Sequence, residues 1–537
     1  MLFLGFSMAN AQMAIEEIKT KNNQIPPTFT DGSPMIDPSP YLKTITAEDL
    51  RAHLTVLASD EFEGRETGTE GNKKAAQYIA KQFKENGFPN IGYQYSYFQK
   101  VNFISEMWDD IDMTVNGKEY RHLWDFYAFP NTNGDTPSVE TNEVVFIGYG
   151  IDDQGYNDYA GVDVQGKVLL SYMGEPTDKS GVSYITGKKE KSEWSSDWRK
   201  KLRTARQKGA KAILFIDGDI KKNIADNRRF LLGSRLKLGE GEKPKDNFAN
   251  NAFISTTIAK AMMGKKYKKV VKARKKIEKK GSPKSVSLKT KLKMVFSKNV
   301  ERLAGDNVLG YVEGTDLKEE LVVVTAHYDH LGKRGDDIYN GADDNGSGTS
   351  TVLEVAEALM AAKKAKAGPR RSVLLMLVTG EEKGLLGSKY YTEYPKFKLE
   401  NTIANVNVDM VGRVDEKYKD NPNYIYVIGS DRLSTELHDI NEAANENFTN
   451  LVLDYTYNDD NDPNRYYYRS DHYNFAEKGI PAIFYFNGTH DDYHRTTDTI
   501  EKINFEKMEI IGKLVFSTVW ELANRDKRIE VNVTGRN

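Results

Sequence analysis

The sequence contains no cysteine. Thiolate nucleophiles, cysteine zinc sites and disulfide bonds are therefore excluded, and any metal site must be built from histidine and carboxylate side chains. No apolar run approaches the roughly 20 residues of a membrane-spanning helix, so no membrane span is expected. The 76 basic and 78 acidic residues give a formal net charge of -2, so no nucleic-acid partner is expected from charge.

A secretory signal is only partly represented at the N-terminus. A short apolar stretch, Leu2 to Met8, precedes the small-x-small pattern Ala9-Asn10-Ala11, but no basic region comes before it. We interpret residues 1–11 as the remnant of a signal, which predicts an exported protein, periplasmic or secreted. The alternative is a frayed apolar N-terminus.

The length of 537 residues predicts two or three domains. Helices are expected over 46–57 and 72–86, the second ending at Gly87. From about residue 136 the pattern changes to short strands at 144–151, 167–173 and 210–217, with a helix at 198–208. The organisation we expect is a signal remnant (1–11), a lead-in (12–41), the first part of a large domain (42–135), a small β-rich α/β insert (136–290) and the catalytic part of the large domain (291–530).

A basic stretch lies inside the predicted insert. Residues 260–280 hold eleven basic residues and one acidic residue, a composition that could indicate nucleic-acid binding. Tyr267 is the only aromatic residue among them, and the chain as a whole is nearly neutral. A solvated basic helix is therefore the better interpretation.

From about residue 300 a strand, a loop and a helix alternate repeatedly. Strands are expected at 321–326, 373–378, 403–408 and 482–486, and a helix at 350–363. This alternation predicts an α/β fold with a mostly parallel central sheet and helices on both faces. In such sheets chemistry gathers beyond the carboxyl ends of the strands.

Polar residues follow these strands. They are His327, Asp329 and His330 after the first, Glu381 and Glu382 after the second, Asp409 after the third, Asp492 and His494 after the last, and Asp343 and Asp344 in the glycine-rich loop NGADDNGSG. Taken singly, each has a structural explanation, such as a helix cap or an Asx turn. Together, histidines and carboxylates at one sheet edge form the donor set that divalent ions require.

Five motifs, in the order HYDH, NGADDNGSG, GEEKGLLGS, NVDMVG and DYHRTTDT, carry a resemblance to a known family. They resemble the co-catalytic dizinc exopeptidases, which include bacterial leucyl aminopeptidases, glutamate carboxypeptidases and the catalytically silent transferrin receptors. The resemblance implies a zinc exopeptidase-like fold. It also implies that the insert, with FIGYGI and KGAKAILFID, is similar to a protease-associated domain.

The resemblance also implies a role for each polar residue. Asp343 would bridge two zinc ions, with a cis peptide bond to Asp344. Glu381 would bind no metal and would act as general base toward a bridging water, and Asp329 would fix the tautomer of its histidine partner. The remaining ligands implied are His327 and Asp409 on one ion and Glu382 and His494 on the other.

Peptide substrates are implied by the same resemblance. We expect Tyr466, Tyr467, Tyr468 and Phe486 to line a side-chain pocket, with packing of a loop as the alternative for the three tyrosines. We expect His472 either to orient substrate or to support its loop. Aminopeptidase action is favoured over carboxypeptidase or dipeptidase action, because Arg413, Arg469 and Arg495 are scattered rather than clustered in the metal loops. A non-enzymatic receptor and glutaminyl cyclisation on a one-zinc scaffold also stay open. The oligomeric state is not set by the sequence.

Overall fold

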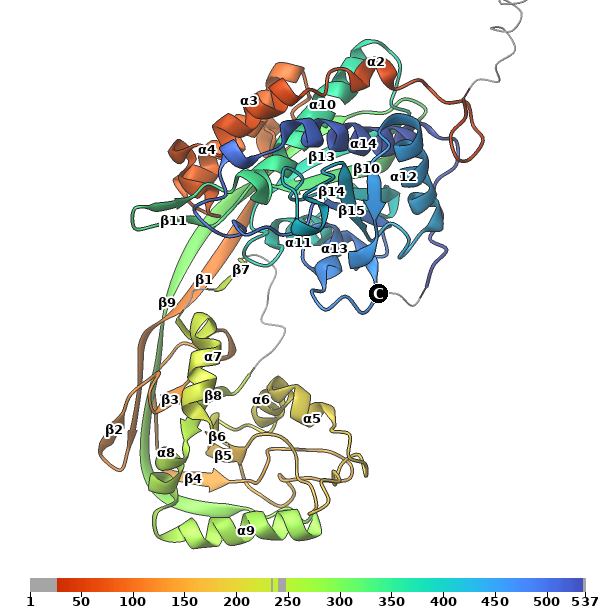
Figure 1. Cartoon of the computed structure of the whole chain (residues 1–537). Coiled ribbons are helices and arrows are strands. Elements are labelled where there is room, and N and C mark those ends of the chain that lie inside the picture. The colour runs from red at the N-terminus through yellow and green to blue at the C-terminus, as the bar shows by residue number, and fades with distance from the viewer. Residues whose placement is uncertain (1–26, 233–234, 240–247, 535–537) are drawn as a thin grey trace, which may run out of the picture. The chain divides into compact units, whose positions relative to one another are not determined.

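The computed structural model describes residues 27–232, 235–239 and 248–534 (Figure 1). The expected signal remnant and the first half of the lead-in, residues 12–26, lie outside the described residues. The chain divides into two compact units, which are described separately: unit 1 is Met1–Asn102 with Ala304–Asn537, and unit 2 is Phe103–Leu303. The predicted insert at 136–290 lies within unit 2, but the unit begins and ends further out than predicted.

Unit 1 is built on a mostly parallel sheet, as predicted. Its strand order is β16-β15-β17-β14-β10-β13-β9, and β10 pairs in parallel with both β13 and β14. The antiparallel pairs are β15 with β17 and β13 with the last residues of β9. The strands are β9 (Val286–Val312), β10 (Leu317–His327), β13 (Arg371–Val378), β14 (Thr402–Val408), β15 (Tyr424–Ile428), β16 (Val452–Asp454) and β17 (Ala482–Phe486), with a small hairpin of β11 (Gly332–Arg334) and β12 (Asp337–Tyr339) beside them.

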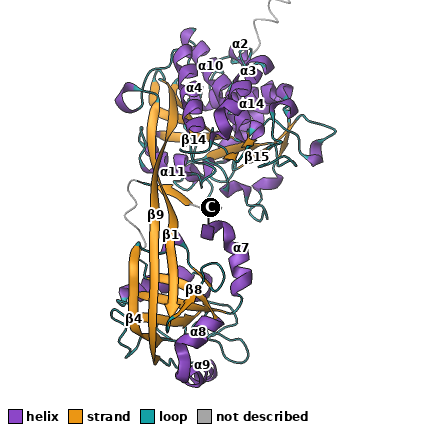
Figure 2. Ribbon diagram, turned by 90° about the vertical axis from the view of Figure 1, so that its left-hand side faces the viewer, coloured by secondary structure: helices purple, strands orange, loops and turns teal. Residues whose placement is uncertain are grey.

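Helices cover both faces of this sheet, which confirms the predicted layers (Figure 2). Strand side chains alternate between faces, and in β10 Val322 and Val324 pack into the core that holds α10 (Gly348–Lys364) and α14 (Phe505–Asn524). The neighbouring Val323 packs on the opposite side, against residues of α11 (Leu386–Glu393) and α13 (His472–Ala476). Helix α12 (Thr435–Phe448) packs beside α14.

The N-terminal helices form where the sequence predicts them. Helix α3 (Ala47–Leu57) is capped by Thr46, whose hydroxyl accepts a hydrogen bond from the backbone N–H of Asp49. Helix α4 (Glu70–Asn86) ends at Gly87, which has a left-handed φ of 88° that glycine adopts without strain. Among the described residues, the short helix α2 (Ser39–Leu42) precedes them.

Arg65, in the loop between α3 and α4, is buried and donates hydrogen bonds to four main-chain carbonyls. Its acceptors are the oxygens of Tyr328, Leu57, Asn340 and Gly341, at 2.6 to 2.9 Å. Three of these carbonyls belong to the loops that follow β10 and precede α10. The guanidinium therefore connects the N-terminal helices to both loops.

Replacement of Arg65 by Gln should lower the free energy of unfolding by about 3 kcal/mol or more, because several buried carbonyls lose a charged donor. Urea unfolding of the purified variant measures this change. Replacing the exposed Arg334, whose ion pair to Glu66 spans 3.8 Å, should change stability by less than about 0.5 kcal/mol. Equal effects of the two substitutions would contradict the role given to Arg65.

In unit 2 the strand order is β9-β4-β5-β6-β8-β3, in which β4, β5, β6 and β8 are parallel. The predicted strand at 144–151 ends at Phe146, because Gly148 and Gly150 have positive φ values of 82° and 69° and turn the chain. The elements of the unit are β1 (Phe98–Val115), β2 (Lys118–Tyr120), β3 (Phe126–Tyr127), β4 (Thr136–Phe146), β5 (Val168–Tyr172), α5 (Glu193–Ser196), α6 (Trp198–Gln207), β6 (Ala212–Asp217), α7 (Ile220–Leu232), β7 (Arg235–Leu238), β8 (Asn250–Ser255), α8 (Thr256–Met263) and α9 (Tyr267–Lys280).

The basic stretch forms mainly α9. Val270, Ala273 and Ile277 are buried on one side of this helix, and its lysines are mostly exposed. Within the described part of the chain, no helix combines the length and the apolar character needed to cross a membrane.

Candidate metal centre and pocket

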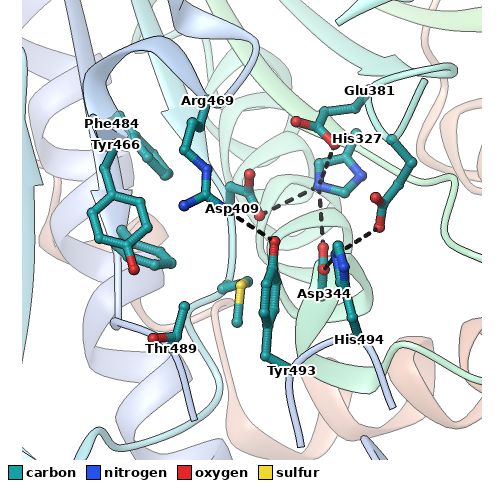
Figure 3. A pocket seen from close by; sticks show the side chains of 13 residues that line it. His327, Asp344, Glu381, Asp409, Tyr466, Arg469, Phe484, Thr489, Tyr493 and His494 are labelled. Atoms are coloured by element: carbon teal, nitrogen blue, oxygen red, sulfur yellow. Dashed lines mark hydrogen bonds and ion pairs between the residues drawn. The ribbon is translucent and has the colours of Figure 1, made fainter. Parts of the chain in front are cut away.

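The polar residues that follow the strands of unit 1 meet at one edge of the sheet, as expected. His327 is the last residue of β10, Asp409 directly follows β14, and Asp344 lies in the turn before α10. Glu381 and Glu382 follow β13, and His494 follows β17. Figure 3 shows these side chains directed toward one another on one side of a pocket.

The first donor group consists of His327, Asp344 and Asp409. The Nε2 atom of His327 lies 3.5 Å from Oδ1 of Asp344 and 3.3 Å from Oδ1 of Asp409. All three residues are buried. The second carboxylate oxygen of Asp409 accepts a hydrogen bond from Ser470 at 2.7 Å, so its free oxygen is held toward the group.

The second donor group consists of His330, Asp344 and Glu382. Nδ1 of His330 lies 2.9 Å from Oε1 of Glu382 and 3.7 Å from Oδ2 of Asp344. His494 reaches the same two carboxylates, with its Nε2 at 3.0 Å from Asp344 and 3.4 Å from Glu382. Asp344 is thus shared, with one oxygen toward each group.

The residues of both groups fit a pair of bound cations. Oδ1 of Asp409 and Oε1 of Glu382 are buried and have no hydrogen-bond partner, although charged oxygens in a protein interior are costly unless they are paired. Imidazole and carboxylate donors suit zinc and related divalent ions. The convergence of unpartnered donors is therefore the feature that a metal pair would explain.

The bridging role is expected for Asp343, but the carboxylate that the two donor groups share is that of its neighbour, Asp344. The carboxylate of Asp343 accepts hydrogen bonds from the backbone N–H of Gly412 at 2.7 Å and from the hydroxyl of Ser347 at 3.0 Å. It also lies 3.2 Å from Nε2 of His490. These contacts hold Asp343 away from both donor groups.

The expected cis peptide bond is also displaced by one residue. The non-proline cis bond joins Asp344 to Asn345, not Asp343 to Asp344. The Asn345 side chain donates to the carbonyl of Val408 at 3.0 Å and accepts from the backbone N–H of Met410 at 3.1 Å. The turn before α10 is thereby joined to the loop that carries Asp409.

Asp329 acts on His327 through its main chain rather than its carboxylate. Nδ1 of His327 lies 3.0 Å from the carbonyl oxygen of Asp329 and 3.7 Å from its carboxylate. A proton on Nδ1 leaves Nε2 free to face the first donor group. The carboxylate accepts instead from Thr67 at 2.7 Å and from the backbone N–H of Glu381 at 3.2 Å. Asp329 therefore positions the loop of Glu381.

Glu381 lies beside both donor groups without belonging to either. Its Oε2 is 3.9 Å from Nε2 of His327. Burial, together with the nearby carboxylates of Glu382 and Asp409, raises the pKa of the Glu381 carboxyl well above its usual range. A buried carboxyl group with a raised pKa is of the kind used in general acid-base catalysis.

The donor groups form one wall of a pocket, and mostly aromatic residues form the other. Of the four aromatic residues expected here, Tyr466 and Phe486 line the pocket, whereas Tyr467 and Tyr468 do not. The ring of Tyr468 packs against Tyr473. The pocket is lined by His327, Asp344, Glu381, Glu382, Asp409, Met410, Tyr466, Arg469, Phe484, Phe486, Thr489, Tyr493 and His494 (Figure 3).

His472 lies behind the pocket wall and not in the pocket. It is fully buried, and its ring stacks on Phe484 at 4.8 Å between centroids. Burial lowers the pKa of His472 to about 3, so the imidazole is neutral. Of the two roles expected for His472, support of the loop is the one that agrees with this position.

Three residues of the site escaped prediction from sequence. His330 belongs to the HYDH motif, but the resemblance gives that position no ligand role. Arg469 lines the pocket although it is distant in sequence from the metal loops. Asp498 accepts hydrogen bonds from the backbone N–H groups of Asp343 and Asp344 at 3.1 and 3.2 Å. In the sequence, Asp498 is marked only by its position near the end of the motif DYHRTTDT.

Comparison with known proteins agrees with this geometry. Residues 307–519 match peptidase family M28. Aminopeptidase YwaD of Bacillus subtilis is 32% identical over 231 residues, which are 41% of this chain and 46% of the relative. A probable leucine aminopeptidase of Trichophyton verrucosum is 33% identical over 212 residues, 38% of this chain and 55% of the relative. The chain spans about half the length of these curated relatives.

A solved structure shares the fold. The aminopeptidase from Aneurinibacillus sp. strain AM-1 is 20% identical, with a TM-score of 0.50 over 93% of this chain and 99% of that one. The segment that carries the donor groups also matches a family in which curated relatives are named aminopeptidases and zinc metalloproteases. Over residues 307–519, the chain is similar to peptidase family M28.

Proposed function

We propose that this protein is a zinc-dependent exopeptidase, a hydrolase that removes the N-terminal residue from peptides. The observation that carries the proposal is the shared Asp344, which presents one oxygen to each of two donor groups while Glu381 stands beside both. A pocket opens directly onto this arrangement. The curated relatives named aminopeptidases support the reaction class.

Two zinc ions are the proposed cofactors. His327 and Asp409 would hold one ion, Glu382 and His494 would hold the other, and Asp344 would contact both. When bound, such a pair lowers the pKa of water and polarises a carbonyl group. The absence of a hydrogen bond on Asp409 Oδ1 and on Glu382 Oε1 is consistent with these assignments.

Glu381 is the proposed general base. It would take the proton from the attacking water and return it to the nitrogen of the leaving amine. The hydrogen bond from its backbone N–H to Asp329 fixes the loop on which it stands. Because Asp329 also orients His327 through its carbonyl, one residue positions a proposed base and a proposed ligand.

The apolar wall of the pocket would accept the side chain of the substrate's first residue. Met410, Phe484 and Phe486 provide apolar surface, and Tyr466 packs against Phe486 at 4.9 Å between ring centroids. Uncharged side chains such as leucine suit such a surface. The carboxylates on the opposite wall suit the free ammonium group of a peptide.

Carboxypeptidase or dipeptidase action is the second candidate, and Arg469 is the observation that favours it. The guanidinium lines the pocket, 3.3 Å from the hydroxyl of Tyr493 and 4.9 Å from the centroid of the Tyr466 ring. Arginine binds carboxylates well, so this cation could receive the C-terminus of a short substrate. The scattering of arginines along the sequence therefore does not exclude a carboxylate site.

A receptor role and glutaminyl cyclisation fit the site less well. A receptor without catalytic activity has no need for a complete set of buried donors and for Glu381 beside them. Glutaminyl cyclisation on a single zinc needs only one donor group, whereas the described residues form two. Titration of zinc into the metal-free protein separates these cases by stoichiometry.

The proposed reaction is tested with aminoacyl p-nitroanilides, their N-acetylated counterparts and dipeptides with free or amidated C-termini. We expect cleavage of the free-amine substrates, loss of cleavage after N-acetylation, and no requirement for a free C-terminus. Removal of metal with a chelator should abolish activity and added zinc should restore it. Activity that survives complete chelation would contradict the proposal.

Replacement of Arg469 by Gln distinguishes the two exopeptidase classes. If the protein is an aminopeptidase, kcat/KM for leucyl p-nitroanilide should change by less than about threefold, since this substrate carries no carboxylate. Loss of a charged hydrogen bond to a substrate carboxylate would instead lower kcat/KM for free dipeptides by about tenfold or more, with amidated dipeptides unaffected. The second outcome would favour the carboxypeptidase or dipeptidase assignment.

Two further assignments are proposals of the same kind. We propose that unit 2 contains a protease-associated domain and that the protein is exported to the periplasm or secreted. Fractionation of producing cells and N-terminal sequencing of the mature protein test export. A mature chain that still begins at Met1 would contradict processing after Ala11.

A further inference from the structure

We propose that His330 is a direct ligand of the ion in the second donor group, in addition to Asp344, Glu382 and His494. The inference rests on the proposed function in requiring that metal binds at all. It goes further, because the family resemblance assigns no ligand role to the residue at this position. The metal pair would then be held by three imidazoles rather than two.

The first observation is the position of the His330 ring. It is fully buried, and Nδ1 lies 2.9 Å from Oε1 of Glu382 and 3.7 Å from Oδ2 of Asp344. Those two oxygens are also the ones that His494 approaches, at 3.4 and 3.0 Å. Both imidazoles therefore face the same two carboxylate oxygens.

The second observation is that the short contact to Glu382 lacks the angles of a good hydrogen bond. Nδ1 of His330 and Oε1 of Glu382 both lack a hydrogen-bond partner, and so does Nε2 of His330. The His330 Nδ1 and Glu382 Oε1 atoms are only 2.9 Å apart, yet the angle does not suit a hydrogen bond. Such a short contact is explained if both atoms face the position of a metal ion. A buried imidazole with neither nitrogen satisfied would otherwise be costly.

The spacing of the donors agrees with coordination of one common ion, on which the attacking water would be a fifth ligand. Zinc binds nitrogen and oxygen donors at about 2.0 to 2.2 Å, which separates neighbouring donors on a tetrahedron by about 3.3 to 3.6 Å. The four separations observed range from 2.9 to 3.7 Å. The centroids of the His330 and His494 rings are 5.8 Å apart, and two imidazoles on one zinc ion place their centroids about 5 to 6 Å apart.

Gly341 supplies the space that the imidazole occupies. A Cβ atom at this position would lie 2.4 Å from Cδ2 and 2.5 Å from Cγ of His330, closer than any real contact. Gly341 also has a φ of 54°. The loop that carries Asp344 thus approaches His330 as closely as a backbone without a side chain allows.

The competing interpretation is that His330 donates a hydrogen bond to Glu382 and only positions it. In that case an imidazole would stand next to the ion without being bound to it. Both interpretations predict weaker metal binding when His330 is removed, so affinity alone does not separate them. The number of imidazoles bound to metal does.

X-ray absorption of the two-zinc protein provides that number. We expect scattering from three imidazoles shared between two ions, and two imidazoles in His330→Ala. The control is His438→Ala, which removes an imidazole of helix α12 that contacts Ser430 and Tyr455 and leaves both donor groups intact. Three imidazoles should remain in this control.

The result for the unaltered protein decides the question even if His330→Ala does not fold. Two ions with only two imidazoles would overturn the ligand role of His330 and leave the proposed function standing. Failure to bind two ions would contradict the proposed function itself. With His330→Asn as a second variant, competition with a chelator should show one ion bound at least about tenfold more weakly and the other unchanged.

Discussion

Replacement of Glu381 by Gln should lower kcat by at least about 100-fold while both ions remain bound. Glutamine keeps the shape of the side chain but cannot accept a proton, and general base catalysis contributes about 10² to 10⁴ in rate. Glu381 belongs to neither donor group, so metal content should not change. Steady-state kinetics on leucyl p-nitroanilide and elemental analysis of the same sample measure both quantities.

The adjacent Glu382 provides a matched control for this substitution. Glu382→Gln alters a neighbouring carboxylate in the same way, but its Oε1 lies in the second donor group. We expect this variant to lose one ion at chelator concentrations that leave the Glu381→Gln protein fully loaded. Full activity in Glu381→Gln would rule out its assignment as the base.

Replacement of Asp344 by Asn should weaken the binding of both ions and abolish activity. Its two oxygens face different donor groups, at 3.5 Å from His327 and 3.0 Å from His494. A single substitution therefore removes a charged donor from each group, which leaves the remaining carboxylates unbalanced. Zinc titration followed by calorimetry should show no binding event of the original affinity.

Asp343 is the matched control for Asp344, since the same change is made one residue earlier. Asp343→Asn should retain both ions, because its carboxylate contacts Gly412, Ser347 and His490 rather than a donor group. A modest loss of stability, about 1 to 2 kcal/mol, is expected from the altered hydrogen bonds. Loss of both ions in Asp343→Asn, with retention in Asp344→Asn, would restore the assignment expected from sequence.

The layers of unit 1 could be predicted from sequence because each signal is local. The apolar run at 482–486 is strand β17 with the same ends, and the cap at Thr46 and the stop at Gly87 bound two helices. Parallel strands place their carboxyl ends at one edge of the sheet. The meeting of the polar loops at that edge could therefore also be predicted from sequence. Of the five predicted ligands, four lie in or against the donor groups.

The identity of the bridging carboxylate depends on contacts that are distant in sequence. Asp343 and Asp344 are equal in chemistry, and their directions are set by hydrogen bonds to Gly412 and Asp498, on separate loops. Arg469 likewise reaches the pocket only through the fold. Strand β9 runs for 27 residues, a length that no short periodic pattern in the sequence indicates.

The hydrogen bonds of Arg65 have a consequence for any attempt to isolate the peptidase part of the chain. A polypeptide trimmed to 307–519 would contain every donor residue yet lack the guanidinium that ties Tyr328, Asn340 and Gly341 together. Such a truncated protein should bind zinc poorly although its ligands are all present. To fold and bind zinc by itself, this region therefore needs the segment of α3, Arg65 and α4, which lies more than two hundred residues earlier in the chain.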